Sequence, residues 1–112
     1  MCDLANNSEK AEILEKAKKL ITQGSFDFVP RRKNMQALAK HGLTIIDAKE
    51  EILELVINNY YKGPKEDFDK PGEIWEFKKS INGTQFYIKF KVVAENGRDI
   101  LKCLGFHDDE FI

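Results

Sequence analysis

A chain of 112 residues with 42% hydrophobic and 33% charged residues fits one soluble domain with a modest core. The net charge of −1 excludes a strongly basic nucleic-acid-binding domain, so any site for a polyanion must be local. No apolar run approaches the roughly 20 residues that span a membrane, and the first seven residues lack the basic and apolar segments of a signal peptide. We therefore expect a cytoplasmic protein without membrane contact, whose two cysteines form no disulfide framework.

The first predicted element is a helix that Asn7 or Ser8 caps and that runs to about Gln23. Either side chain can accept a hydrogen bond from a free N–H group of the first helical turn. Apolar residues recur on one face of this helix: Ile13, Leu14, Ala17, Leu20 and Ile21. We expect residues 1–7 to be flexible and residues 26–29 to form a short extended link.

A second helix is predicted from Pro30 or Arg31 to about His41. We expect three apolar residues of this helix to face the core: Met35, Leu38 and Ala39. Its first turn carries three cations: Arg31, Arg32 and Lys33. Their charge has the wrong sign for the helix dipole, but cations beside the free N–H groups of a helix start can bind phosphate. A solvated basic cluster, or a patch for an acidic protein partner, is the alternative.

Thr44 and Asp47 predict the start of a third helix, because they have the spacing of a capping box. Five apolar residues define its buried face: Ile45, Ala48, Ile52, Leu55 and Val56. Residues 8–59 therefore form a helical part, and residues 60–73 form a loop that is rich in charge. We expect all of these elements, and the sheet that follows, to belong to a single domain.

The sheet is predicted over residues 74–107, beginning with two strands over 74–79 and 85–91 that Asn82-Gly83 joins. Both turn residues accept positive φ, which makes this pair the strongest short hairpin signal. Counting outward from the turn gives four facing pairs: Phe77 with Ile88, Trp75 with Phe90, Glu76 with Lys89, and Lys78 with Tyr87. A slip of one residue would turn every aromatic side chain to the wrong face.

The third predicted strand, residues 100–107, follows the turn signal Asn96-Gly97. A two-residue turn there would place Leu104 and Phe106 on the polar face. We therefore predict an odd-length loop, such as Asn96-Gly97-Arg98 with a bulge. In that register three pairs form: Leu104 with Phe90, Phe106 with Ile88, and His107 with Tyr87. Residues 108–112 are predicted to be an acidic tail.

Side chains alternate between the two faces of a strand, so one face of this sheet is apolar. It carries Trp75, Phe77, Phe86, Ile88 and Phe90. We predict an α+β fold in which the N-terminal helices pack on this face of a twisted antiparallel sheet. The other face stays open and carries Glu76, Lys78, Tyr87, Lys89, Lys91 and His107.

The groups on the open face are those that cleave RNA without a metal ion. A base removes the proton of the 2′-OH, an acid protonates the leaving 5′ oxygen, and cations stabilise the charge on the phosphorane. Glu76 is the candidate base and His107 the candidate acid. Tyr87 can donate to the phosphate, stack on a nucleobase or act as the base itself. The candidate electrostatic stabilisers are Lys62, Lys78, Lys89 and Lys91.

The same residues allow other interpretations. The open face can be an ordinary exposed surface with cross-strand ion pairs, or a non-catalytic module that binds RNA or an acidic protein. A third interpretation is an interaction domain that docks through residues 31–33. Because His41 and His107 lie far apart in the sequence, and no metal-ligand spacing or nucleotide motif occurs, we expect no metal and no cofactor.

Four short motifs occur in order: Tyr60-Tyr61-Lys62, Glu73-Ile74-Trp75, Phe86-Tyr87-Ile88-Lys89 and Gly105-Phe106-His107. In their order and spacing the chain resembles, over about residues 10–107, the MqsR family of toxins. That family belongs to type II toxin–antitoxin systems and has the RelE-like fold. The resemblance implies an endoribonuclease that cleaves mRNA and arrests growth, and a cognate antitoxin protein that silences it. Position by position, it assigns functional roles to Lys62 and Tyr87.

Two positions depart from the family pattern. Glu76 stands where the prototype has glutamine, and His107 stands where it has lysine. These departures move the site towards the Glu-plus-His pairing of some other RelE-like nucleases, in agreement with the acid and base assigned from chemistry. The ribosome is not predicted as a partner.

Overall fold

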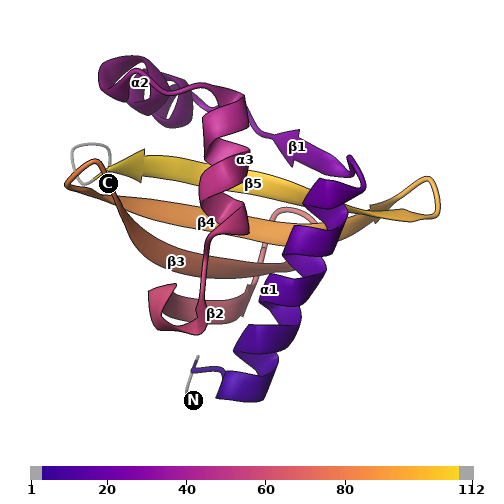
Figure 1. Ribbon diagram of the computed structural model, residues 1–112. Helices are drawn as coiled ribbons and strands as arrows, with labels where there is room; N and C mark the ends of the chain where they lie inside the picture. The colour runs from indigo at the N-terminus through magenta and orange to yellow at the C-terminus, as the bar shows by residue number, and fades with distance from the viewer. Residues whose placement is uncertain (1–3, 109–112) are drawn as a thin grey trace.

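The computed structural model describes residues 4–108, which form three α-helices, one short 3-10 helix and five strands (Figure 1). The helices are α1 (Asn7–Thr22), α2 (Arg32–His41), α3 (Ile45–Leu53) and the 3-10 helix η1 (Ile57–Asn59). The strands are β1 (Phe26–Phe28), β2 (Tyr60–Glu66), β3 (Glu73–Ile81), β4 (Thr84–Glu95) and β5 (Arg98–Asp108). The predicted α+β class is confirmed. Within residues 4–108, no helix is both long and apolar enough to cross a membrane.

The strands form one sheet in the order β1-β5-β4-β3-β2. β2 to β5 are antiparallel neighbours, whereas β1 pairs in parallel with β5. The three predicted strands are antiparallel, as expected, but the sheet has two further strands, β1 and β2, and the parallel β1 makes it mixed. β1 lies in the stretch predicted as a link, and β2 lies in residues 60–73, which were predicted to be a loop.

The β2 strand shows no alternating pattern because its pairing with β3 is interrupted twice by register shifts. Gly63 lies between two of its paired residues, with φ of 119°, and a Cβ atom there would be 2.6 Å from the carbonyl oxygen of Ile74. Only glycine allows this close approach at this backbone angle. The glycine that indicates a loop in the sequence is thus part of a strand.

The α1 helix begins one residue earlier than predicted, because Asn6 rather than Asn7 or Ser8 is its cap. The Asn6 side chain accepts a hydrogen bond from the Glu9 N–H at 2.8 Å. The Glu9 carboxylate in turn accepts from the Asn6 N–H at 2.9 Å. This reciprocal pair is a capping box, which satisfies two N–H groups of the helix start.

Residues 1–7 were predicted to be flexible, and the structure describes residues 4–7 of this segment. Ala5 is buried, and its N–H donates to the Tyr60 hydroxyl at 3.1 Å. Asn7 is already the first residue of α1. Residues 1–3 lie outside the described residues.

The α3 helix begins at the predicted capping box, with the Asp47 N–H donating to the Thr44 hydroxyl at 3.1 Å. Three predicted positions are buried: Ala48, Ile52 and Leu55. Ile45 and Val56 were predicted to be buried but are 41% and 53% exposed. Ile45 is the first residue of the helix, and Val56 follows the helix in an extended conformation, where helical periodicity no longer applies.

The α2 helix presents a different face to the sheet from the one predicted. Met35 is 40% exposed and Ala39 is also exposed. The buried residues are Asn34, Ala37 and Leu38. With His41, which is partly buried, they have the spacing of one helix face. Because two of these four residues are polar, hydrophobic periodicity could not identify that face.

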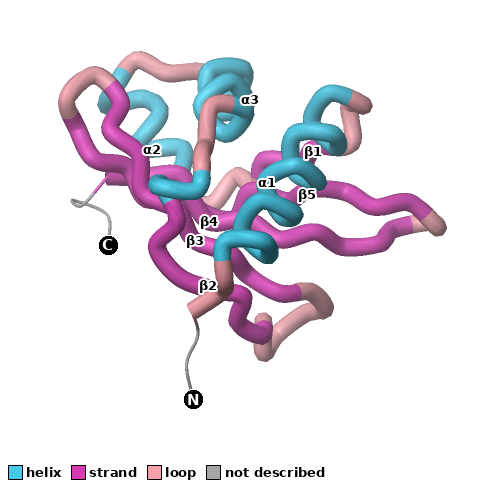
Figure 2. The backbone as a smooth tube through the Cα atoms, turned by 60° about the horizontal axis from the view of Figure 1, so that its bottom comes forward, coloured by secondary structure: helices cyan, strands magenta, loops and turns pink. Residues whose placement is uncertain are grey.

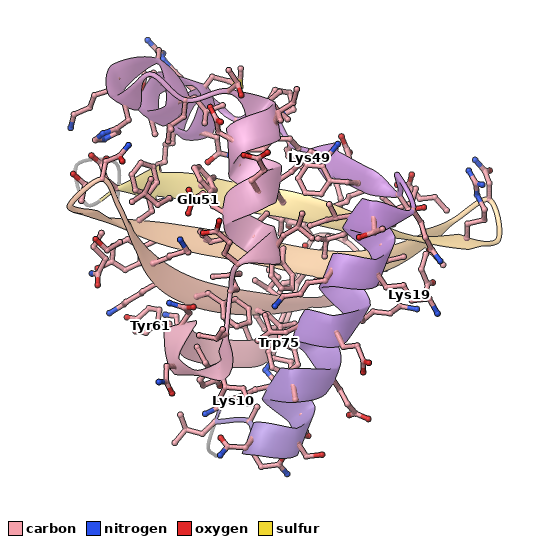
Figure 3. The ribbon with its side chains drawn as sticks, in the orientation of Figure 1. Lys10, Lys19, Lys49, Glu51, Tyr61 and Trp75 are labelled. Atoms are coloured by element: carbon pink, nitrogen blue, oxygen red, sulfur yellow. The ribbon has the colours of Figure 1, made fainter. Side chains whose placement is uncertain are left out.

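Helices α1 and α3 lie on the same face of the sheet in both views (Figure 1 and Figure 2). The side chains beneath them are those predicted to be apolar. Phe77 and Phe90 are fully buried, and their rings stack with centroids 5.2 Å apart. Trp75 is 7% exposed and lies beside α1 (Figure 3). The apolar face of the predicted sheet is therefore the core of the domain.

The register of the β3–β4 hairpin is confirmed, because all four predicted pairs form. The β4–β5 connection is different from the one predicted. Glu95 pairs with Arg98, so Asn96-Gly97 is a two-residue turn rather than an odd-length loop. The odd residue is Leu104, which forms a bulge inside β5.

The bulge corrects the register in the middle of the strand instead of in the turn. Phe90 pairs with Cys103, so the predicted pairing of Phe90 with Leu104 is wrong. Beyond the bulge, Phe106 pairs with Ile88 and His107 with Tyr87, as predicted. The bulge therefore returns His107 to the open face.

Candidate functional site

A cavity of about 380 Å³ opens on the face of the sheet that α1 and α3 do not cover. Six predicted site residues line it: Lys33, Lys62, Glu76, Tyr87, Lys89 and His107. They come from β2, β3, β4, β5 and the first turn of α2. Tyr61 and Ile88 complete the lining. Residues from four adjacent strands and one helix thus form one site, which no single sequence motif indicates.

The antiparallel register brings these side chains together. Glu76 of β3 pairs with Lys62 of β2 on one side and with Lys89 of β4 on the other. Lys89 in turn pairs with Gly105 of β5. Directly paired residues share a face, so this row crosses the sheet with a carboxylate between two ammonium groups.

The Glu76 side chain is 12% exposed, and its carboxylate lies 3.5 Å from the Lys65 ammonium group. Lys89 is half-buried, and this burial lowers the pKa of its ammonium group, as do the charges of Arg31, Lys65 and Lys33. Glu76 acts on that pKa in the opposite direction. The site therefore holds more positive than negative charge, which favours an anionic ligand.

An array of aromatic rings forms a second row of the site. The rings of Tyr87 and His107 are nearly parallel with centroids 6.5 Å apart, and the Tyr61 ring meets the Tyr87 ring edge-on at 6.1 Å. The Lys78 ammonium group lies 3.8 Å from the Tyr61 ring centroid and 5.3 Å from that of Tyr87. Lys78 flanks the cavity and does not line it. Flat rings beside cations suit nucleobases next to phosphates.

The His107 ring has a defined orientation. Its Nδ1 atom lies 3.2 Å from the carbonyl oxygen of Asp108. A carbonyl oxygen only accepts hydrogen bonds, so Nδ1 carries the proton in that contact. The other ring nitrogen, Nε2, is then the atom that exchanges a proton with a bound substrate.

Gly105 does not line the cavity itself but lies close to His107 and Lys89, which do. A Cβ atom at Gly105 would lie 3.3 Å from the Lys89 Cβ and 3.8 Å from the His107 Nε2 atom. Because glycine has no side chain, the space between the imidazole and the ammonium group stays open.

The basic first turn of α2 is held against the open face by a buried amide. Asn34 donates to the Leu104 carbonyl at 2.9 Å and accepts from the Phe106 N–H at 2.9 Å. It thereby satisfies two backbone groups of β5 beyond the end of β1. This contact places Lys33 at the cavity wall. Arg31 is near enough to act on Lys89, whereas Arg32 is exposed and does not line the cavity.

Lys91 was predicted to bind RNA, but the structure does not bring it into the cavity. Lys91 is 3% exposed, and its ammonium group donates to the Asp67 carboxylate at 2.6 Å and to the Pro71 carbonyl at 3.0 Å. The hydrogen bond from Lys91 lowers the pKa of Asp67. Lys91 therefore fastens the loop that follows β2 onto the open face.

Asp108 was predicted to begin the acidic tail, but it is the last residue of β5 and is 4% exposed. Its carboxylate lies 2.7 Å from His41 Nε2 and 3.1 Å from the Lys40 ammonium group. Burial alone would raise its pKa, but these two contacts lower it. The Asp108 carboxylate is thus engaged by α2, and only its backbone carbonyl contacts the His107 ring. Residues 109–112 lie outside the described residues.

The sequence interpretation missed Tyr61, Lys65 and Gly105 as parts of this region. Tyr61 and Lys65 fell in the predicted loop, where no alternation assigned them to a face. Gly105 has no side chain whose chemistry could indicate a role in the site. The signal that could have found Tyr61 is its position beside Lys62.

A larger cavity of about 710 Å³ lies elsewhere, between α1 and the β2–β3 edge. It mixes Glu9, Glu12 and Glu73 with Lys16 and Lys19, and none of the described residues that line it carries an imidazole or a phenol. The smaller cavity is the better candidate site because its groups include an acid, a base and an excess of cations.

Within residues 4–108, no three histidine, cysteine, aspartate or glutamate side chains form a group that could hold a metal ion. The fold and the cavity define an α+β domain with a polar, mainly cationic site on an open sheet face. Comparison with models of known protein families gave no match, and comparison with curated proteins gave none either.

Proposed function

We propose that this protein is an endoribonuclease that cleaves single-stranded RNA in the cavity by general acid–base catalysis, without a metal ion. One observation carries the proposal: Glu76, His107, Tyr87 and three lysines from separate elements line a single cavity. Each chemical role in RNA cleavage has a candidate group there.

In the proposed reaction, the Glu76 carboxylate removes the proton of the 2′-OH, and the 2′ oxygen attacks the adjacent phosphorus. The bond from phosphorus to the 5′ oxygen breaks, and the Nε2 atom of protonated His107 gives its proton to that oxygen. The products are a 2′,3′-cyclic phosphate and a 5′-OH. Lys62 and Lys89 stabilise the charge on the phosphorane, and Tyr87 donates to a phosphate oxygen.

The spacing of the strands supports these roles. Glu76 is on β3 and His107 on β5, with β4 between them. Two strand spacings of about 4.8 Å separate the backbones by roughly 10 Å. A base and an acid that approach a phosphate from opposite sides need room for the phosphate between them, and the cavity that both side chains line is where it would lie.

Alternative roles for the same face are binding without catalysis and docking of an acidic protein. Docking of an acidic protein requires only positive charge, and binding of RNA requires positive charge and aromatic rings. The Glu76 carboxylate inside the cavity and the oriented Nδ1 of His107 favour catalysis, because neither alternative needs them.

We further propose, from the resemblance to the MqsR family, that the natural substrate is mRNA, that cleavage arrests growth, and that a cognate antitoxin protein silences the enzyme. The test is induced expression in bacteria of the wild type and of the Tyr87→Phe/His107→Gln double variant. Growth and the 5′ ends of mRNA are recorded for both.

Growth arrest with new mRNA 5′ ends in the wild type, both lost in the double variant, is the expected result. Arrest that persists in the double variant and is lost in Lys62→Glu/Lys89→Glu would instead support binding without catalysis. Normal growth with both proteins would contradict the toxin proposal.

A further inference from the structure

Beside the candidate active site, a second hollow of about 640 Å³ lies against the loop that connects β2 and β3. Its apolar lining comes from Pro64, Phe68 and Ile74. Ile74 lies two residues before Glu76 on β3, so both side chains are on the open face of the sheet. The hollow is thus next to the active-site cavity on the same surface.

One ion pair links this hollow to the active-site cavity. Lys65 lines the hollow, and its ammonium group lies 3.5 Å from the Glu76 carboxylate, which lines the cavity. A chain that leaves the cavity past Glu76 therefore meets the ammonium group of Lys65 and then the apolar walls around Ile74.

The aromatic residue of the hollow is Phe68. Its side chain is 92% exposed, the largest exposed fraction among the exposed large hydrophobic residues of the described chain. An exposed aromatic ring gains nothing from burial in the core, and its free face is available to stack on another flat ring. The loop that carries it does not depend on Phe68, because Lys91 fastens the loop through Asp67 and Pro71.

The charges around the hollow favour a nucleobase over a phosphate as its ligand. Asp67 is neutralised by Lys91, but Glu66 and Asp69 add carboxylates beside the single ammonium group of Lys65. These carboxylates repel a phosphate, whereas they can accept hydrogen bonds from the amino group of a base. An aromatic ring and aliphatic walls suit the flat face of a base.

We propose that this hollow is a nucleobase subsite, in which a base next to the cleaved bond stacks on Phe68 while Lys65 contacts the intervening phosphate. This inference rests on the proposed RNA cleavage and adds a residue that recognises the substrate. Phe68 contacts a base and not the reacting phosphate, so its loss affects KM more than kcat.

The experiment uses a single-stranded RNA oligonucleotide that the wild type cleaves, and copies of it with a single abasic nucleotide at each position near the cleaved bond. Cleavage kinetics are measured for the wild type, Phe68→Ala and Phe68→Trp. Ile46→Ala is the matched control, because Ile46 is a 66% exposed apolar residue on α3. The midpoint of unfolding is measured for all variants.

We expect Phe68→Ala to raise KM by roughly 5- to 150-fold, the range for loss of one stacked base, with kcat unchanged. Phe68→Trp and Ile46→Ala should behave as the wild type. For the wild type, one abasic position should raise KM by a similar factor. For Phe68→Ala, the same abasic position should leave KM unchanged. This pair of results would assign the missing base to Phe68.

A wild type that cleaves RNA, together with a Phe68→Ala variant of equal KM, would overturn the subsite alone. An increase in KM that no abasic position removes would also overturn it, because Phe68 would then act without contacting a base. A wild type that neither cleaves nor binds the oligonucleotide would overturn the proposed function and the subsite together.

Discussion

The two faces of the sheet are built from the same strands but serve different purposes. On β4, Phe86, Ile88 and Phe90 are fully buried beneath the helices, whereas Tyr87 and Lys89 alternate with them and line the open cavity. The helix-covered face holds the fold together by removing apolar area from water. The open face keeps charged groups partly solvated, which the core could not tolerate. Because side chains alternate along each strand, one set of residues stabilises the fold and the other set forms the candidate site.

The open face is itself divided. Around Glu76 and Lys89, paired strands leave a cavity, but two residues further along β4 the ammonium group of Lys91 is covered by a loop. Lysines on this face therefore have different roles: Lys89 lines the cavity, whereas Lys91 holds a loop in place. The following changes test this division, in order of decreasing effect on the free energy of unfolding.

Phe77→Ala should have the largest effect on stability. Its ring is fully buried and stacks on Phe90, and removal of such a ring typically costs about 3–5 kcal/mol. Urea unfolding measures the loss, with the exposed Ser80→Ala on the same strand as the control. A loss under about 1 kcal/mol would show that the helix-covered face is not the core that we describe.

Asn34→Ala should cost about 2–4 kcal/mol, because it leaves the buried carbonyl of Leu104 and the N–H of Phe106 without partners. It should also weaken RNA cleavage, since Asn34 holds the turn that places Lys33 at the cavity. Gln36→Ala, which changes an exposed residue of the same helix, should alter neither. Unchanged cleavage by a folded Asn34→Ala protein would mean that the basic turn has no role in the site.

Gly105→Ala should change stability by only about 1 kcal/mol but lower cleavage by up to about 10²-fold. The new methyl group would press on the stem of Lys89 and narrow the space beside His107, and displacements of about 1 Å have effects of that size. Single-turnover cleavage kinetics give the measurement. A Gly105→Ala variant with the wild-type rate would show that the space beside Gly105 has no role in the reaction.

Asp67→Asn should alter the pH dependence of stability. Lys91 lowers the pKa of Asp67 in the folded protein below its ordinary value of 3.8. The stabilisation is therefore complete above that value and is lost as the pH falls through the lower, folded pKa. Between about pH 6 and about pH 2, the free energy of unfolding should fall less for Asp67→Asn than for the wild type. An equal fall for both proteins would contradict the assignment.

The sequence predicted the hairpin and its faces because the register set by Asn82-Gly83 places Trp75, Phe77, Phe86 and Phe90 on one face. It predicted four cavity residues from the same alternation: Glu76, Tyr87, Lys89 and His107. Lys33 was predicted from the basic start of α2, and Lys62 from the charged stretch after α3 and the family resemblance. The bulge at Leu104 could not be located, because a turn insertion and a strand bulge give the same parity. β2 could not be recognised, because its irregular pairing and Gly63 remove the pattern of a strand. The sequence alone does not distinguish Lys91 from the lysines of the site, because its burial depends on the loop that covers it.

The most direct test of the central claim is cleavage of a single-stranded RNA by the purified protein in the presence of EDTA. We expect the wild type to give 2′,3′-cyclic phosphate and 5′-OH ends. Glu76→Gln and His107→Gln should each slow the reaction by about 10²–10⁴-fold, while their free energies of unfolding stay within about 0.5–1 kcal/mol of the wild type. Wild-type rates in both folded variants would contradict the account, because the open face would then hold the groups for acid–base catalysis without using them.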